Sequence, residues 1–276
     1  MKKYDVIIIG AGIAGMTAGI YAVRAGKSVL VLESTVQGGQ IINTLNIENW
    51  PGDLGISGAD LSQKIYAQAT KLGVQFEFEE VVAIKDATGP AAAFPPFSSS
   101  SMGVPQAASP VGSFNGFIIQ TDEAEYACQN VILAVGTEPR KLSEKQAKDA
   151  GKRPISYCAT CDGALYKGKP VVVVGSGNTA KHEMKYLENI ASKVYHIHHD
   201  DPIPEDAEAV FVAIGRVPNT EFLKGFVDLD SQGYIIAGED CKTSREGVFA
   251  IGDCRTKSVR QLVTAASDGA TAVSAL

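Results

Sequence analysis

Tyr4-Asp-Val-Ile-Ile-Ile-Gly10-Ala-Gly12-Ile-Ala-Gly15 joins a short β-branched run to a glycine-rich turn. A helical pattern follows as far as Arg24, and a second apolar run, Ser28 to Leu32, ends at Glu33. Strand, turn, helix and strand in this order predict the start of a parallel sheet.

Each residue of the Gly10-x-Gly12-x-x-Gly15 pattern has a physical task. Gly10 permits a tight turn, Gly12 lets the backbone approach a pyrophosphate, and Gly15 lets the helix pack on the strand. Glu33 lies 21 residues beyond Gly12 at the end of the second strand, where it can accept hydrogen bonds from both ribose hydroxyls. Together these residues predict a dinucleotide site.

The same order of elements recurs later in the chain. It comprises a strand at Pro170 to Val174, a turn at Gly175 to Ala180, a helix at Lys181 to Ile190 and a strand at Lys193 to Ile197. Further strands are expected at Asn130 to Val135, Ala209 to Ile214 and Gly247 to Ile251. The predicted fold class is therefore α/β, with two Rossmann-like domains and the second, shortened domain inserted in the first.

The domain boundaries follow from this repetition. We expect residues 1–140 and 216–276 to form the first nucleotide-binding domain and residues 144–213 the second. Residues 87–114 contain five prolines, a serine run, several alanines and no charged residue, and they predict a flexible insertion between strands. A tolerated surface insertion and a docking or regulatory loop are both open for this segment.

Composition excludes several classes of function. The chain has 276 residues, 45% of them hydrophobic, which supplies a core for one large or two modest domains. The net charge of −6 and the lack of a long basic cluster exclude a nucleic-acid surface. The absence of an uncharged apolar stretch of about 18 residues argues against a membrane span. Five cysteines do not make a disulfide scaffold in a chain of this length, and a reducing cytoplasm is expected.

Cys158-Ala-Thr-Cys161-Asp162-Gly163 precedes the first strand of the second domain. Two thiols separated by two residues can close a reducible disulfide, and an inert buried pair is the alternative. Asp162 can pass protons as the disulfide opens, or it is a solvated carboxylate without a role.

Metal binding is not expected at the cysteines or at the histidines. Zinc would need a second cysteine pair, and Cys128, Cys241 and Cys254 lack the spacing to provide one. The stretch from His196 to Asp201 resembles a metal cluster only superficially, and solvated positions at a strand end are expected instead.

An acid also follows an apolar strand near the C-terminus. Gly252-Asp253 comes directly after Val248 to Ile251, so the chain returns to the first domain with a carboxylate at the carboxyl end of a strand. There Asp253 could bind the ribityl hydroxyls of a flavin, or cap a helix, and both tasks are compatible.

Seven motifs together are specific. They are GAGIAG at 10–15, GGQ at 38–40, ENWPG at 48–52, CATCDG at 158–163, GSGNTA at 175–180, AIGRVPNT at 213–220 and GDCRTKSVRQ at 252–261. On these motifs the chain resembles the low-molecular-weight thioredoxin reductases over nearly its whole length outside residues 87–114.

The resemblance implies FAD as cofactor and assigns roles to individual residues. Cys161 would face the flavin, Cys158 would attack the disulfide of thioredoxin or a thioredoxin-like protein, and Asp162 would be the acid. Members of the family are usually homodimers whose small domain rotates. The implied FAD-binding residues are Gly10, Gly12, Gly15, Glu33, Gly39, Gln40, Asn49, Gly136, Gly252, Asp253, Arg260 and Gln261.

The chain departs from the family at the second nucleotide site. Members that use NADPH follow the second strand of the small domain with a His-Arg-Arg stretch that holds the 2′-phosphate, whereas this chain has His198-His199-Asp200-Asp201. Only Pro202 to Ala209 then precedes the next strand, where the family has a helix and several strands. The resemblance thus points to family branches that take electrons from ferredoxin rather than NADPH. A conventional NAD(P)H-dependent reductase and a non-catalytic, redox-responsive flavoprotein are the alternatives.

Overall fold

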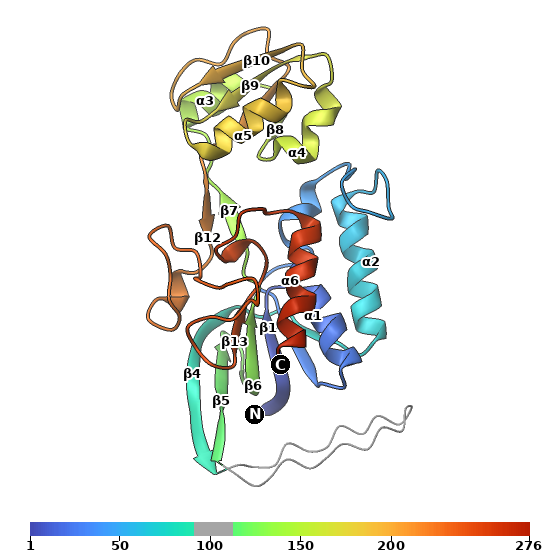
Figure 1. Cartoon of the computed structure of the whole chain (residues 1–276), viewed down its shortest axis with the longest axis vertical. Helices are drawn as coiled ribbons and strands as arrows, with labels where there is room; N and C mark the ends of the chain where they lie inside the picture. The colour runs from blue at the N-terminus through green and yellow to red at the C-terminus, as the bar shows by residue number, and fades with distance from the viewer. Residues whose placement is uncertain (91–112) are drawn as a thin grey trace. The chain divides into compact units, whose positions relative to one another are not determined.

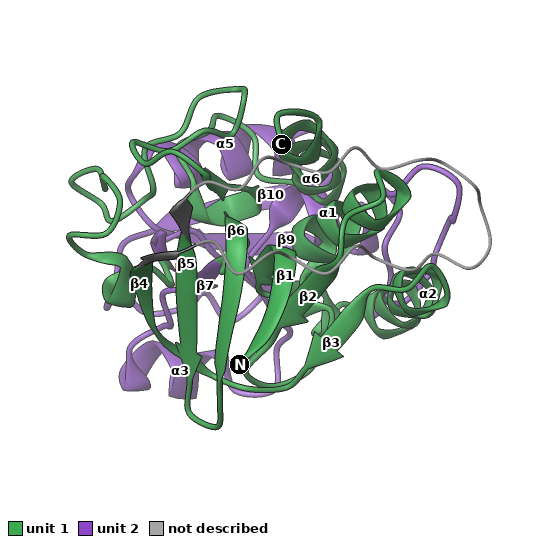
Figure 2. Cartoon of the chain, turned by 90° about the horizontal axis from the view of Figure 1, so that it is seen from below, with its two compact units in different colours: residues 1–44, 58–136, 218–276 green, residues 45–57, 137–217 purple. Residues whose placement is uncertain are grey.

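The structure is a computed structural model that describes residues 1–90 and 113–276. The chain divides into two compact units, which Figure 2 shows in different colours. Unit 1 comprises residues 1–44, 58–136 and 218–276, and unit 2 comprises residues 45–57 and 137–217.

Unit 1 is built on a sheet whose centre is parallel, as the alternation of strand and helix predicts. The apolar strand β1 pairs with β2 on one side and β6 on the other, and β3 and β13 extend the parallel part. On its edge away from β1, the N-terminal half of β6 pairs with β5 of an antiparallel hairpin formed by β4 and β5. The strands are β1 (Lys2–Ile9), β2 (Val29–Leu32), β3 (Gln75–Glu77), β4 (Val81–Pro90), β5 (Ser113–Thr121), β6 (Glu125–Leu133) and β13 (Val248–Ala250).

The helices of unit 1 pack closely because small residues line their contacts. Helix α1 (Ile13–Arg24) contacts both α2 (Gly58–Lys71) and α6 (Leu262–Ser274), and Figure 1 shows α1 and α6 side by side. A Cβ atom at Gly269 would lie 2.6 Å from the carbonyl oxygen of Ala14, so only glycine permits this approach. Short 3₁₀ turns complete the unit at η1 (Gly39–Asn43), η3 (Glu221–Leu223) and η4 (Gly252–Cys254).

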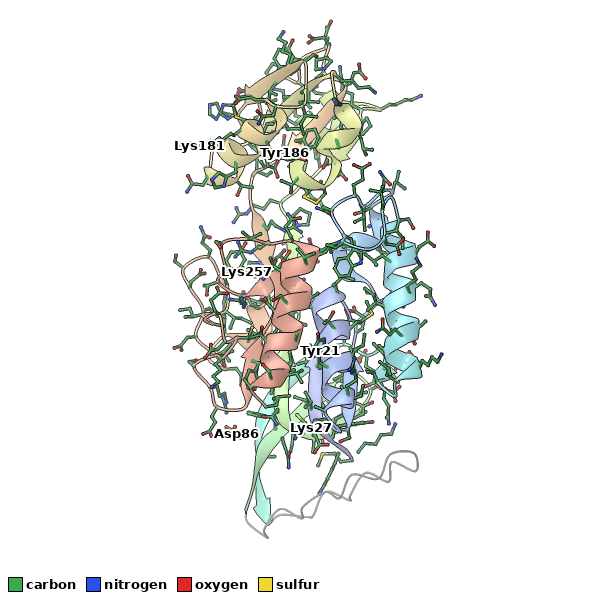
Figure 3. The ribbon with its side chains drawn as sticks, turned by 45° about the vertical axis from the view of Figure 1, so that its right-hand side comes forward. Tyr21, Lys27, Asp86, Lys181, Tyr186 and Lys257 are labelled. Carbon is green, nitrogen blue, oxygen red and sulfur yellow. A yellow bond between two sulfur atoms is a disulfide. The ribbon has the colours of Figure 1, made fainter. Side chains whose placement is uncertain are left out.

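A buried ionic network joins α6 to the segment after β13. The carboxylate of Asp268 accepts hydrogen bonds from Arg255 through Nε at 2.9 Å and Nη2 at 2.8 Å, and from Lys257 Nζ at 2.8 Å. Asp268 Oδ2 also accepts the backbone N–H of Gly252 at 2.8 Å. Burial alone would raise the pKa of Asp268, but the bonds from Arg255 and Lys257 hold it below its usual range. Lys257 is labelled in Figure 3.

We expect Asp268→Asn to destabilise unit 1, because it leaves two buried cations without their counter-charge. The free energy of unfolding should fall by about 3 kcal/mol or more. Urea unfolding followed by circular dichroism measures this change. The control is Glu221→Gln, which breaks the exposed pair with Lys224 and should cost less than about 1 kcal/mol. Equal losses in the two variants would contradict the importance of the network.

Unit 2 contains a smaller parallel sheet with the order β10-β9-β11-β8. The valines of β9 pack alternately into two separate hydrophobic clusters, so the strand is buried on both faces as in a doubly covered parallel sheet. The strands are β8 (Ile155–Ser156), β9 (Pro170–Val174), β10 (Lys193–Ile197) and β11 (Ala209–Val212), and the helices are α3 (Glu144–Ala150), α4 (Ala159–Asp162) and α5 (Asn178–Leu187). A 3₁₀ turn, η2 (Gly163–Tyr166), follows α4, and β7 (Thr137–Pro139) pairs with β12 (Arg216–Pro218).

The connection between β10 and β11 is short. Residues 198–208, all of which the structure describes, contain no helix or strand. Two side chains tie this connection to α3 and the turn after it. Gln146 Nε2 donates to the carbonyls of His198 at 2.9 Å and Asp201 at 3.1 Å, and Arg153 donates to the carbonyls of Glu205 and Ala207. The connection is therefore held through its main-chain carbonyl groups, which accept hydrogen bonds from these two side chains.

The α/β fold with two Rossmann-like sheets is confirmed, and several predicted boundaries are corrected. Strand β6 begins at Glu125 rather than Asn130, because it pairs with β5 before it reaches β13. Helix α5 begins three residues earlier than predicted, because the glycine-rich turn ends at Gly177. Residues 45–57 group with unit 2, although the predicted first domain included them.

The predicted insertion at 87–114 is shorter at both ends than expected. Strand β4 continues to Pro90 and β5 begins at Ser113, and the two strands pair in register across Pro90 and Ser113. The rest of the predicted insertion, 91–112, lies outside the described residues. Within the described part of the chain, no helix is both long and apolar enough to cross a membrane.

Candidate functional site

Cys158 and Cys161 form a disulfide with a Cα–Cα distance of 5.3 Å. The single turn of α4 creates this geometry, since the backbone N–H groups of Cys161 and Asp162 both donate to the carbonyl of Cys158. Residues three apart thereby face the same side of the turn. Both cysteines are half-buried, and the predicted disulfide is confirmed. Figure 3 draws it in yellow.

Ser156 connects the backbone of the disulfide to Asp162. The Ser156 hydroxyl donates to Asp162 Oδ2 at 2.6 Å. The hydroxyl oxygen of Ser156 also accepts the backbone N–H of Cys158 at 3.1 Å. Ser156 is buried at the end of β8, so its position is set by the sheet. The carboxylate expected to handle protons is thus held beside the disulfide by a fixed hydroxyl.

Glu183 is a second carboxyl group at α4. It lies on α5, which packs against α4. The pKa of Glu183 is raised to about 7, and burial is the largest cause. The charge of Asp162 also raises this pKa, whereas the backbone N–H of Ala159 and the charge of Arg216 lower it. The disulfide turn is therefore flanked by two acids that differ in environment.

The other three cysteines are free thiols in buried positions. Burial raises the pKa of Cys241 to about 11 and that of Cys254 to about 12, and it also raises the pKa of Cys128. These thiols stay protonated at neutral pH and are poor nucleophiles. Among the described residues, no group of three or more His, Cys, Asp and Glu side chains is placed to hold a metal ion.

The glycine-rich turn of unit 1 has the shape that a pyrophosphate requires. Gly10 has φ +107°, and a Cβ atom there would lie 2.4 Å from the carbonyl oxygen of Ala134. A Cβ atom at Gly15 would lie 1.9 Å from the carbonyl oxygen of Gly10, whereas one at Gly12 would meet no atom within 4 Å. Gly10 and Gly15 are thus required by packing, and Gly12 borders open space at the N-terminus of α1.

Glu33 follows β2 and lies beside this turn. Its Oε2 accepts the backbone N–H of Ala11 at 2.8 Å, and its Oε1 accepts that of Thr35 at 3.2 Å. The first bond fixes the carboxylate at the carboxyl end of the parallel sheet, where the ribose of a bound dinucleotide lies in this type of fold.

The remaining predicted cofactor-binding residues converge on the same edge, with one exception. A Cβ atom built on Gly39 would lie 3.5 Å from the Cα atom of Gly12. A Cβ atom built on Gly136 would lie 3.7 Å from Gln40 Nε2. Asn49 lies in residues 45–57 of unit 2 and is not placed with them.

The C-terminal motif also reaches this part of unit 1. Gly252 approaches α1, since its ideal Cβ atom would lie 3.1 Å from the Cβ atom of Ala14. Arg260 Nε donates to the carbonyl of Asp253 at 3.2 Å, and the guanidinium lies 4.2 Å from the ring centroid of Tyr234. Gln261 is the N-cap residue of α6. Asp253 itself lies in the 3₁₀ turn η4, and the alternative that it caps a helix is not borne out for α6.

Unit 2 has a second turn of the same type. Gly175 has φ +146°, its carbonyl contacts His196 Nε2 at 2.6 Å, and the ideal Cβ position at Gly177 again meets no atom within 4 Å. His196, His198 and His199 are exposed at the end of β10, as predicted. Asp200 has φ +74° and pairs with His199 at 3.1 Å, and its hydrogen bond with Ser143 helps to lower its pKa.

Known proteins share this arrangement. The family described as pyridine nucleotide-disulphide oxidoreductase matches residues 4–205 and 200–269. Thioredoxin reductase from Bacillus subtilis is 33% identical over 319 aligned positions, which cover 98% of this chain and 93% of the relative. Because this chain has 276 residues, the relative contains segments that have no counterpart here.

Solved structures give the same result. Thioredoxin reductase from Streptococcus pyogenes is similar with a TM-score of 0.81 at 30% identity, covering 99% of this chain and 96% of the other. A ferredoxin-flavin thioredoxin reductase from Clostridium acetobutylicum is similar with a TM-score of 0.57 at 26% identity, covering 100% and 96%.

The fold and the half-buried disulfide define a disulfide oxidoreductase built on two Rossmann-type units. The chain belongs to the pyridine nucleotide-disulphide oxidoreductase family. The family implies FAD, and the turn of unit 1 fits this cofactor because Gly12 leaves room for a pyrophosphate and Glu33 lies at the ribose position.

Two residues beside the disulfide escaped the sequence analysis. Ser156 gave no signal, because its partner Asp162 lies six positions away on another element. Glu183 did give one, since it occurs three residues after Ala180 and four before Leu187, two fully buried positions of α5. An acid on the apolar face of a helix is uncommon and marks a position worth inspecting.

A pair of alanine substitutions tests the proposed FAD turn. Gly12→Ala should leave the stability of the protein without cofactor nearly unchanged but weaken FAD binding at least about tenfold, because the methyl group fills the space for the pyrophosphate. Gly15→Ala should destabilise the protein itself, since its methyl group overlaps a backbone carbonyl. Thermal unfolding without FAD and fluorescence titration with FAD separate the two effects. Unchanged FAD affinity in Gly12→Ala would argue against this site.

Proposed function

We propose that this enzyme reduces the disulfide of thioredoxin or a thioredoxin-like protein through the Cys158–Cys161 pair, with FAD bound in unit 1 and ferredoxin rather than NADPH as electron donor. The observation that carries the proposal is the half-buried Cys158–Cys161 disulfide. It lies next to Asp162, whose carboxylate is held by the hydroxyl of Ser156. FAD, when bound, would supply the two-electron reduction that opens this disulfide.

The thiol chemistry can be written with the residues of this chain. In the reduced pair, Cys158 is the nucleophile whose thiolate attacks one sulfur of the partner disulfide, forming a mixed disulfide and releasing the other partner sulfur as a thiolate. Cys161 then attacks the Cys158 sulfur of the mixed disulfide, restores the Cys158–Cys161 bond and releases the second partner sulfur. Asp162, oriented by Ser156, is placed to take up and return the protons that these steps move.

The electron donor is proposed from the second nucleotide turn. Asp200 and Asp201 lie after β10, where a bound NADPH would present its 2′-phosphate, and two carboxylates there repel a phosphate group. The short connection at 198–208 also removes structure that would border an adenosine. The similar ferredoxin-flavin thioredoxin reductase from Clostridium acetobutylicum supports ferredoxin as the alternative donor.

A nicotinamide donor is the second candidate, and one observation favours it. The turn at Gly175 keeps the backbone shape of a pyrophosphate site, including the open space at Gly177 and the N-terminus of α5. An NADH or NADPH molecule bound through its pyrophosphate alone would use this turn.

The proposal also includes a homodimer in a reducing cytoplasm. The homodimer rests on the family resemblance. The compartment rests on cysteine usage, since Cys128, Cys241 and Cys254 are free and buried while the only disulfide among the described residues is the redox pair.

Removal of the nucleophile tests the thiol chemistry. We expect Cys158→Ser to retain bound FAD and its yellow colour but to lose reduction of thioredoxin, measured with a thioredoxin-coupled insulin assay and dithionite-reduced ferredoxin as donor. Cys128→Ala, which removes a buried thiol of unit 1, is the control and should keep most of the turnover. Turnover by Cys158→Ser comparable to that of the parent enzyme would rule out the proposed chemistry.

An anaerobic titration tests the donor. Reduced ferredoxin should bleach the flavin absorbance within the mixing time of a stopped-flow instrument, whereas NADPH and NADH should bleach it at least about a hundredfold more slowly. Rapid bleaching by NADPH would instead establish the nicotinamide donor. Reduction by ferredoxin without any turnover of thioredoxin would assign the chain a non-catalytic, redox-responsive role.

A further inference from the structure

Glu183 occupies the apolar face of α5, where a carboxyl group has no structural need. Its neighbours on that face, Ala180 and Leu187, are fully buried in the core of unit 2. The other side chains of the helix near it, such as Lys181 and Lys185, are exposed and polar. Figure 3 labels Lys181 and Tyr186 on the same helix. Glu183 is therefore half-buried, with its Oε2 atom fully buried.

Helix α5, which carries Glu183, packs against α4, the helix of the disulfide. The backbone N–H of Ala159, at the start of α4, lowers the pKa of Glu183, and Ala159 is covalently joined to Cys158. The Oε2 atom of Glu183 is buried and has no hydrogen-bond partner among the described residues. An unpartnered oxygen of a buried carboxyl group favours the protonated form, because burial disfavours the charge.

The charges around Glu183 come from two other elements. Asp162 on α4 opposes ionisation of Glu183, and Arg216 on β12 favours it. Because burial is the largest influence, the pKa of Glu183 rises to about 7, so the group changes charge near neutral pH. A thiolate that forms in the same turn adds another negative charge and favours the protonated form further.

We propose that Glu183 is a positioning residue for the redox pair: its neutral carboxyl group permits a thiolate at the Cys158–Cys161 turn, and its carboxylate opposes one. Opening of the disulfide by two electrons and one proton gives one thiol and one thiolate. Without a further proton, the turn would carry three negative groups, namely the thiolate, Glu183 and Asp162. Protonation of Glu183 reduces this number to two. The electrons come from the reductive half of the proposed reaction, on which this inference rests.

The consequence is a thiol whose acidity depends on a neighbour. Below pH 7 the neutral Glu183 adds no negative charge beside the thiolate. Above pH 7 the carboxylate raises the pKa of the thiol and reduces the fraction of thiolate available to attack a partner disulfide. The reduced pair therefore gains less nucleophile with rising pH than an isolated thiol would.

Alkylation of the reduced holoenzyme tests this inference without donor or partner protein. The enzyme is reduced with dithiothreitol, desalted anaerobically and reacted with iodoacetamide between pH 5 and pH 9, and mass spectrometry follows modification of the peptide that contains Cys158. Glu183→Gln should lower the apparent pKa of the reactive thiol by about one pH unit, which raises the alkylation rate near pH 7 several-fold. The control is Glu188→Gln at the exposed end of α5, which should leave the profile unchanged.

A profile of Glu183→Gln that coincides with the parent profile would overturn the inference, even if the enzyme reduces thioredoxin as proposed. Conversely, loss of turnover in Cys158→Ser assays would not affect the alkylation result. The two hypotheses therefore fail independently.

Protein stability provides a second measurement. The pKa of Glu183 is raised in the folded state relative to its ordinary value of 4.5, so the stability that its protonated form provides is present below about pH 4.5 and is lost as pH rises through about 7. Glu183→Gln lacks this loss, and its free energy of unfolding should therefore increase relative to that of the parent between pH 5 and pH 8. A constant difference over this range would show that Glu183 does not titrate there and would overturn the inference.

Discussion

The close approach of α1 to the turn that precedes it is the constraint on which unit 1 depends. The Cα atom of Gly15 lies so near the carbonyl of Gly10 that any side chain would overlap it. This contact brings the N-terminus of α1 to the carboxyl edge of the sheet, where Glu33 also lies. Helix α6 then packs on α1 through Gly269 with a similar lack of space. The position of α1 is thus set by Gly15 and Gly269, two residues at which a side chain would overlap a backbone carbonyl.

Unit 2 repeats this arrangement with less structure around it. Its turn keeps Gly175 and Gly177, but Ala180 stands where unit 1 has Gly15, and the ideal Cβ position of Gly175 lies 3.3 Å from the Cβ atom of Ala180. The methyl group of Ala180 thus lies beside this turn, where unit 1 has no side chain. The sheet itself is intact, whereas the connection between β10 and β11 is reduced to residues 198–208. The cysteine pair lies at α4, which packs against α5, and Asp162 is oriented by Ser156 of β8, so the surroundings of the pair come from elements other than residues 198–208.

Local patterns in the sequence were sufficient for the elements that carry the family resemblance. Strands β9 and β10 match their predicted bounds, and the disulfide follows from the spacing of Cys158 and Cys161. The start of β6 was predicted wrongly because it depends on a partner strand: β6 is extended by its pairing with β5, a contact that no local pattern reports.

The candidate site shows the same division. Glycines and Glu33 were predicted because their tasks are encoded by spacing along one βαβ unit. Asp268 and Glu183 were not, because each acquires its environment from a helix packing against another segment, Asp268 against Arg255 and Glu183 against α4. Both are acids on otherwise apolar helix faces. An acid in such a position is the feature of a sequence that indicates a tertiary contact of this kind.

The way in which Gln146 and Arg153 hold residues 198–208 has an evolutionary consequence. Both side chains bind carbonyl oxygens, which every amino acid carries, so exchanges along this connection leave its attachment to α3 intact. Exposed positions such as His199 and Glu205 are therefore free to change charge at little cost to folding. A lineage with this scaffold can therefore change the charge of this connection through single surface mutations, without first passing through an unstable intermediate protein.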